Sequence, residues 1–171
     1  REFVRINQHV WGLNNPAMLA SQIEAESGFV DGLTSSAGAR GICQAMPATA
    51  SLVERADSGL NGLTRYSVPY CLRFQAWLMK DEYSAYKPGR GPCTALLFAG
   101  GAYNGGRRML DAEIAQCRAD SECDPTRWFG HVSAKRTRSW AAFNESRPYV
   151  TRLYMREGAY ADAGFGVAQC R

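Results

Sequence analysis

The segment NPAMLASQIEAESG (Asn15–Gly28) carries the signals of a helix at both of its ends. Asn15 belongs to the residue types that are favoured at the N-cap position. Pro16 suits the first helical position, where no backbone N–H is needed. Gly28 is the residue type that commonly follows the last helical residue. We therefore predict a helix over residues 16–27.

Two carboxylates lie near the end of this helix. On a helical wheel, Glu26 falls about 20° from Leu19, whereas Glu24 falls about 140° away. We therefore expect Glu26 to lie on the apolar face and Glu24 to point toward solvent. Burial and the negative end of the helix dipole both raise the pKa of a carboxyl group, which makes Glu26 a candidate proton donor. The alternative is a structural carboxylate that pairs with an arginine.

Helical patterns recur along the rest of the chain, and alternating β patterns are scarce. The segment Gly32–Gln44 is long and irregular, and it is the one place where a small pair of strands fits. The predicted fold is therefore mostly α. Further helices are predicted to begin near Pro47, to cover 67–86, 92–103 and 105–117, and to begin again at Ser146 with Pro148 in the first turn.

Length and composition are those of one globular domain over residues 1–171, with 46% hydrophobic and 21% charged residues. No apolar run is long enough to predict a membrane-spanning helix. No signal peptide is visible, and the chain starts at Arg1, so we expect a processed product or a domain of a longer protein. The net charge of +4 suits an anionic partner such as nucleic acid, a membrane surface or bacterial wall, or simply a solvated face.

An even number of cysteines, six in all, indicates an oxidising compartment. No CxxC pair occurs and the only histidines are His9 and His131, which argues against a zinc site. The sequence leaves the pairing open, but Cys117 and Cys123 enclose a short polar loop and form the most plausible local disulfide. A cysteine amidase that uses Cys43 with His131 is disfavoured, because no local nucleophile signature accompanies Cys43.

Three motifs follow the Glu26-Ser27 pair: SSAGARGICQAMPATA (Ser35–Ala50), AYNGG (Ala102–Gly106) and ESRPYV (Glu145–Val150). Together and in this order they resemble the soluble lytic transglycosylase (SLT) domain, a family related to goose-type lysozyme. The resemblance covers a motif-bearing core of about 15–157. It implies a single lysozyme-like domain, mostly α, with a small irregular or β-containing region after the catalytic helix.

The resemblance also implies a role for individual residues. Glu26 matches the catalytic acid/base. The residues that match substrate-binding positions are Ser35, Gln44, Tyr103, Asn104 and Tyr149, and possible supporting residues are Ser27, Asp31, Cys43 and Glu145. The sequence departs from the family pattern at Cys43, which replaces the usual methionine and alters the subsite that it would line.

Structural roles remain open for several of these residues. Tyr103 and Tyr149 are also compatible with core aromatics, and Asn104 with a turn before two glycines. Glu145 is expected to support the helix that begins at Ser146, since its charge favours a helix N-terminus.

The activity that the resemblance implies is cleavage of the β-1,4 bond between N-acetylmuramic acid and N-acetylglucosamine, with a 1,6-anhydro sugar as product. The expected partners are peptidoglycan strands and not nucleic acid, and no metal or cofactor is implied. We expect an exported protein of the periplasm or cell envelope, as a monomer or as a domain of a larger envelope or virion assembly. The alternatives are a hydrolytic lysozyme that uses Asp31 and a wall-binding component of a phage or secretion apparatus.

Overall fold

A computed structural model describes residues 2–10 and 15–170, and 63% of the chain is helical. Seven α-helices account for nearly all regular structure in the described residues, so the mostly α, lysozyme-like fold class is confirmed. The chain divides into two compact units. The first unit runs to Lys80 and includes residues 156–169; the second consists of residues 81–155 and Cys170. The expectation of a single domain stays a prediction.

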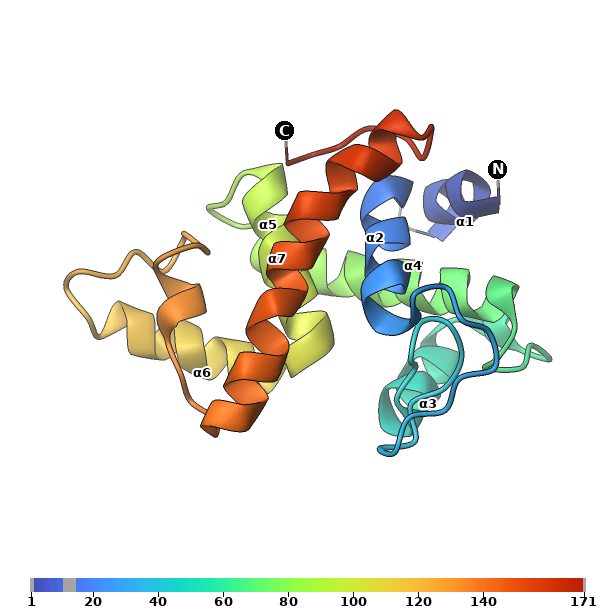
Figure 1. The fold of residues 1–171 in the computed structure, drawn as a ribbon, viewed down its shortest axis with the longest axis horizontal. Helices are drawn as coiled ribbons and strands as arrows, with labels where there is room; N and C mark the ends of the chain where they lie inside the picture. The colour runs from blue at the N-terminus through green and yellow to red at the C-terminus, as the bar shows by residue number, and fades with distance from the viewer. Residues whose placement is uncertain (1, 11–14, 171) are drawn as a thin grey trace. The chain divides into compact units, whose positions relative to one another are not determined.

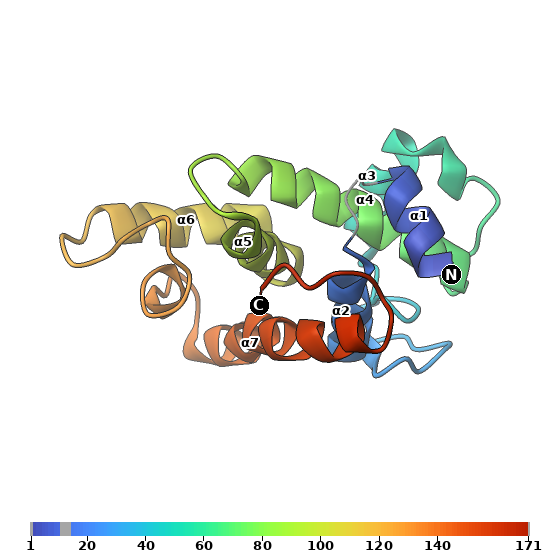
Figure 2. The same ribbon diagram turned by 90° about the horizontal axis from the view of Figure 1, so that it is seen from above.

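Most helices of the first unit come from the N-terminal half of the chain. They are α1 (Glu2–Val10), α2 (Pro16–Ser27), α3 (Pro47–Ala56), the short 3-10 helix Ser58–Leu60, the first part of α4 (Val68–Tyr86) and the last part of α7 (Trp140–Asp162). Helix α1, which the sequence analysis did not identify, packs against α2 (Figure 2). The backbone N–H of Asn15 donates to Oδ1 of Asn7, and this bond ties the start of α2 to α1.

Helix α2 begins at Pro16 and ends before Gly28, as predicted. Gly28 has a φ of 59°, so this left-handed residue ends the helix, and its N–H donates to the carbonyl of Glu24. Every residue of Pro16–Ile23 is buried. The helix is therefore covered on all sides over its first two turns. A wheel with a single apolar face does not describe it, and that step of the sequence analysis is wrong.

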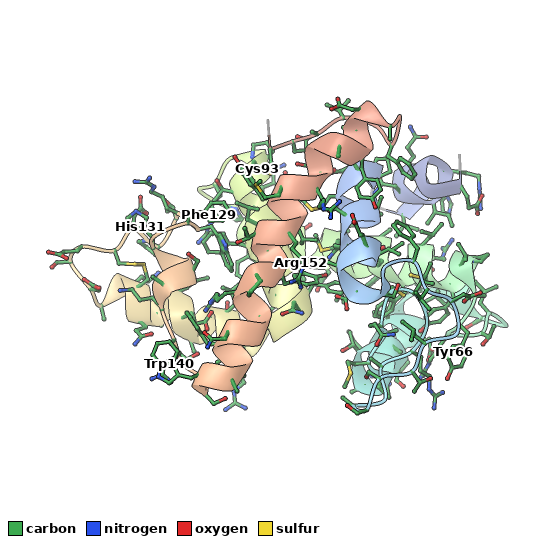
Figure 3. All side chains as sticks on the ribbon, in the orientation of Figure 1. Tyr66, Cys93, Phe129, His131, Trp140 and Arg152 are labelled. Carbon is green, nitrogen blue, oxygen red and sulfur yellow. A yellow bond between two sulfur atoms is a disulfide. The ribbon has the colours of Figure 1, made fainter. Side chains whose placement is uncertain are left out.

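The second unit contains α5 (Pro92–Gly105) and α6 (Arg107–Arg118), which pack against each other (Figure 1). The 3-10 helix Val132–Ala134 packs on α6. The unit also contains the last part of α4 and most of α7. The predicted disulfide Cys117–Cys123 is present, and a second one joins Cys93 to Cys170 (Figure 3).

The predicted start of the last helix is wrong. Helix α7 begins at Trp140 and not at Ser146, so Pro148 lies inside the helix. Ser139 provides the true start: its Oγ accepts from the N–H of Ala142, at 3.3 Å, and its carbonyl accepts from Phe143. Glu145 therefore occupies an interior position of the helix, so the expected support of a helix N-terminus does not apply to it.

Candidate active site

Glu26 lies in the last turn of α2 and is half-buried. The neighbouring Ser27 connects this turn to the loop that follows the helix. Its Oγ donates to the carbonyl of Ile42 at 2.7 Å and also lies 3.3 Å from the carbonyl of Ile23. The end of α2 is thus held against the loop by a side chain adjacent to Glu26.

The loop after α2 contains the small β region that the sequence predicted. Isolated antiparallel bridges join Thr34 to Arg40 and Arg40 to Ala45. Ser35 closes the first turn of this loop, because its Oγ accepts from the N–H of Ala39 at 3.0 Å. The backbone N–H of Ser35 donates in turn to the carbonyl of Ala39. The observed role of Ser35 is therefore to shape the loop, and contact with a sugar stays a prediction.

Gln44 lies in the same loop with a φ of 47°, which is unusual for a residue other than glycine. Its Nε2 donates to the carbonyl of Gly41 at 2.8 Å, so its side chain lies against its own loop. Backbone strain of this kind persists only where the surrounding structure holds the residue in place, and it is common in ligand-binding segments. Cys43, directly before it, is fully buried.

Among the glycines of this loop, Gly41 has the least space for a side chain. Its φ is 71°, and a Cβ would lie 2.4 Å from the carbonyl oxygen of Arg65. Replacing Gly41 by alanine is expected to lower the free energy of unfolding by about 2–3 kcal/mol, because backbone strain and a backbone clash add together. Gly32→Ala is the matched control, since Gly32 has a φ of 72° but no atom within 4 Å of such a Cβ. Urea unfolding measures both losses, and equal losses would contradict the argument.

Glu24 does not point into solvent, so its predicted orientation is wrong. Its carboxylate accepts from the hydroxyl of Tyr160 at 2.9 Å and forms an ion pair with Arg156 at 3.1 Å. Burial, followed by the bond to Glu24, raises the pKa of Tyr160 to about 12. Both partners come from the last part of α7, and no local sequence pattern predicts that this segment lies beside α2. Glu24 is thus a structural carboxylate of the first unit.

Glu26 points away from these partners. Residues two apart on a helix differ by about 200° in direction, so Glu26 lies on the face opposite to Glu24. On that face the carboxylate of Glu26 acts electrostatically on the thiol of Cys71, in the first turn of α4. Glu24 and Glu26, two residues apart, therefore have different surroundings.

Asp31 is exposed, and its Oδ1 accepts from the N–H of Gly32 at 2.8 Å.

The expected site residues are divided between the two units. The first unit contains six of them: Glu26, Ser27, Asp31, Ser35, Cys43 and Gln44. The other four belong to the second unit. Tyr103 is half-buried and Asn104 exposed near the end of α5, Glu145 lies within α7, and Tyr149 of α7 is buried. Their roles beside Glu26 stay predictions.

The described residues contain no cluster of three or more histidine, cysteine or acidic side chains that would hold a metal ion. None of the described helices combines the length and apolar character needed to cross a membrane.

Comparison with known proteins places the chain in a family. The family model described as the transglycosylase SLT domain matches residues 8–123, which is more than half of the chain. The match includes Glu26, the loop after α2 and the Tyr103-Asn104 pair. The family consists of glycan-cleaving enzymes that act on peptidoglycan in the cell envelope. A search of the curated proteins finds no match. On this evidence the chain belongs to the transglycosylase SLT domain family.

Proposed function

We propose that the protein is a peptidoglycan lytic transglycosylase that cleaves the β-1,4 bond between N-acetylmuramic acid and N-acetylglucosamine. The observation that carries the proposal is the position of Glu26, which lies half-buried at the end of α2, beside a loop that is tied to the helix by Ser27. The neighbouring Glu24 is already engaged by Arg156 and Tyr160. Glu26 matches the catalytic acid/base of the family, and it is the carboxylate that we assign to acid/base chemistry.

In the proposed reaction Glu26 donates its proton to the glycosidic oxygen as the bond breaks. The N-acetyl group of the substrate stabilises the positive charge at the anomeric carbon. The 6-hydroxyl of the same muramic acid then attacks that carbon, and the Glu26 carboxylate takes up the hydroxyl proton. The product is a 1,6-anhydro ring, no water is consumed, and the carboxyl group is restored to its starting state.

A single carboxylate suffices for this route because the attacking hydroxyl is part of the substrate. Intramolecular attack in a well-oriented complex gains about 7–11 kcal/mol over a bimolecular reaction. Glycosidases that use water or an enzyme nucleophile generally need a second carboxylate. Asp31 is the next acidic residue after Glu26 in the sequence, but it is exposed and hydrogen-bonded to the adjacent backbone.

Mass spectrometry of the muropeptides released from purified peptidoglycan tests the reaction type. We expect most new muramic acid ends to carry the 1,6-anhydro ring, which is lighter than a reducing end by one water and is not reduced by borohydride. Asp31→Asn is expected to retain both the rate and the product, because the amide oxygen still accepts from Gly32. Mainly reducing ends, together with loss of activity in Asp31→Asn, would show a hydrolytic lysozyme instead.

We place this activity in the periplasm or cell envelope of a bacterium, or on a virion that must cross the wall. The two disulfides, Cys93–Cys170 and Cys117–Cys123, support an oxidising compartment. Attachment to a larger envelope or virion assembly is compatible with this location. Zymography against purified wall material separates the enzyme from a wall-binding protein that lacks activity.

A further inference from the structure

Two cysteines take no part in the disulfides described above. Cys43 and Cys71 belong to the first unit and form no disulfide in the structure. Both side chains are fully buried, with 0% of their surface exposed. Cys43 lies in the loop after α2, Cys71 lies in the first turn of α4, and the two side chains are hydrogen-bonded to each other. Two thiols from separate parts of the sequence are thus in contact in the core of the first unit, near Glu26.

The contact between this loop and the segment before α4 is fixed at several points. The backbone of Gly41 is pressed against the carbonyl of Arg65, where no side chain would fit. The hydroxyl groups of Thr34 and Tyr66 share a hydrogen bond of 2.9 Å, and Tyr66 is labelled in Figure 3. The loop is therefore docked on the segment before α4 at two points that precede Cys43, and this docking brings Cys43 toward the start of α4.

We propose that Cys43 and Cys71 close to a third disulfide, which ties the loop after Glu26 to α4. The proposal goes beyond the proposed function and does not depend on it. The cross-link joins the loop that contains Gln44 to the longest helix segment of the first unit. It replaces a hydrogen-bonded pair of thiols by a covalent bond at a site that the other two disulfides, both in the second unit, do not constrain.

The chemistry is thiol–disulfide exchange with a small-molecule or protein disulfide as oxidant. The thiolate of one cysteine attacks the oxidant and releases one thiol. The thiolate of the second cysteine then attacks the mixed disulfide and releases the other thiol, so the oxidant takes up two electrons and two protons. Burial and the bond to Cys43 raise the pKa of Cys71, which makes its thiol a poor nucleophile in the folded protein. We therefore expect the exchange during folding, before the loop docks.

Intact-mass measurement tests the cross-link. Reduced, unfolded protein is refolded with increasing ratios of oxidised to reduced glutathione until Cys93–Cys170 and Cys117–Cys123 are closed, then alkylated in denaturant and digested without reduction. We expect no alkylated thiol and a cross-linked peptide pair that contains Cys43 and Cys71. Alkylation of both of these cysteines, or a disulfide from either one to another cysteine, overturns the proposal.

Alanine variants provide a second readout. A disulfide is lost entirely when either cysteine is replaced, so Cys43→Ala and Cys71→Ala are each expected to lower the unfolding midpoint of the oxidised protein by about 5–10 °C. The double variant is then expected to lower it little further. Two independent thiols would instead give small decreases in the unfolding midpoint that add together in the double variant. That result would contradict the cross-link.

Discussion

Glu26→Gln is expected to reduce peptidoglycan cleavage by about 10²–10⁴-fold, the usual contribution of a general acid. The amide keeps the size and shape of the side chain but has no proton to give to the glycosidic oxygen. Glu26 is half-buried at the end of α2, so the substitution leaves the helix and its C-terminal Gly28 intact. Release of soluble muropeptides gives the rate, and circular dichroism with thermal unfolding shows whether the fold is retained.

Glu24→Gln is the matched control, because Glu24 lies in the same helical turn and has the same chemistry. It is expected to cleave peptidoglycan at nearly the wild-type rate. The substitution is expected to lower the free energy of unfolding instead, because the side chain no longer carries the charge that pairs with Arg156. The side chain of Arg156 is 59% exposed, and such a pair contributes up to about 1 kcal/mol. Similar losses of activity in the two variants would refute the assignment of Glu26 and leave no distinction between the two faces of the helix.

The motifs predicted the fold class and the local structure of the site because they are short and local. A proline and a glycine marked both ends of α2, and the glycine-rich segment after it forms the β-bridged loop. The pair Cys117–Cys123 followed from a six-residue separation. The pair Cys93–Cys170, with a separation of 77 residues, depends on packing that no local pattern contains.

The two incorrect predictions have different origins, one in tertiary contacts and one in a local helix cap. Glu24 was expected in solvent because the sequence does not show that Arg156 and Tyr160 return to cover it. The start of α7 was placed at Ser146 because Pro148 is typical of a first helical turn. The capping bonds of Ser139 start the helix at Trp140 instead.

A buried cluster of charged residues in the second unit was also missed, although the sequence contained a signal for it. In α6 the residues Leu110, Glu113, Ile114 and Cys117 follow the spacing of one helical face, and all four are buried. A glutamate on such a face requires a positively charged partner, because an unpaired buried carboxylate is costly. The basic run Lys135–Arg138 contains one such partner.

Two arginines meet Glu113 in the interior of this unit. The side chain of Glu113 is 0% exposed, and Oε1 pairs with Arg138 at 3.3 Å and with Arg147. Arg147 also donates to the carbonyl of Lys135 at 2.8 Å, and its guanidinium lies 4.6 Å from the ring centre of Phe143. One carboxylate thus neutralises part of the charge of two largely buried guanidinium groups, and it joins α6 to the segment that leads into α7.

Glu113→Gln is therefore expected to lower the free energy of unfolding by about 3–5 kcal/mol, because it leaves two buried positive charges without a counter-charge. The amide preserves the volume of the side chain, so the loss reports the charge and not a cavity. Urea unfolding measures it, with Glu122→Gln as control, since Glu122 is exposed in the same unit and its substitution should cost less than about 0.5 kcal/mol. If the free energy of unfolding falls equally little in both variants, water reaches the arginines and the cluster does not stabilise the unit. If Glu113→Gln alone is destabilised, and replacing Arg138 by methionine in that variant recovers part of the loss, the unpaired guanidinium is the cause.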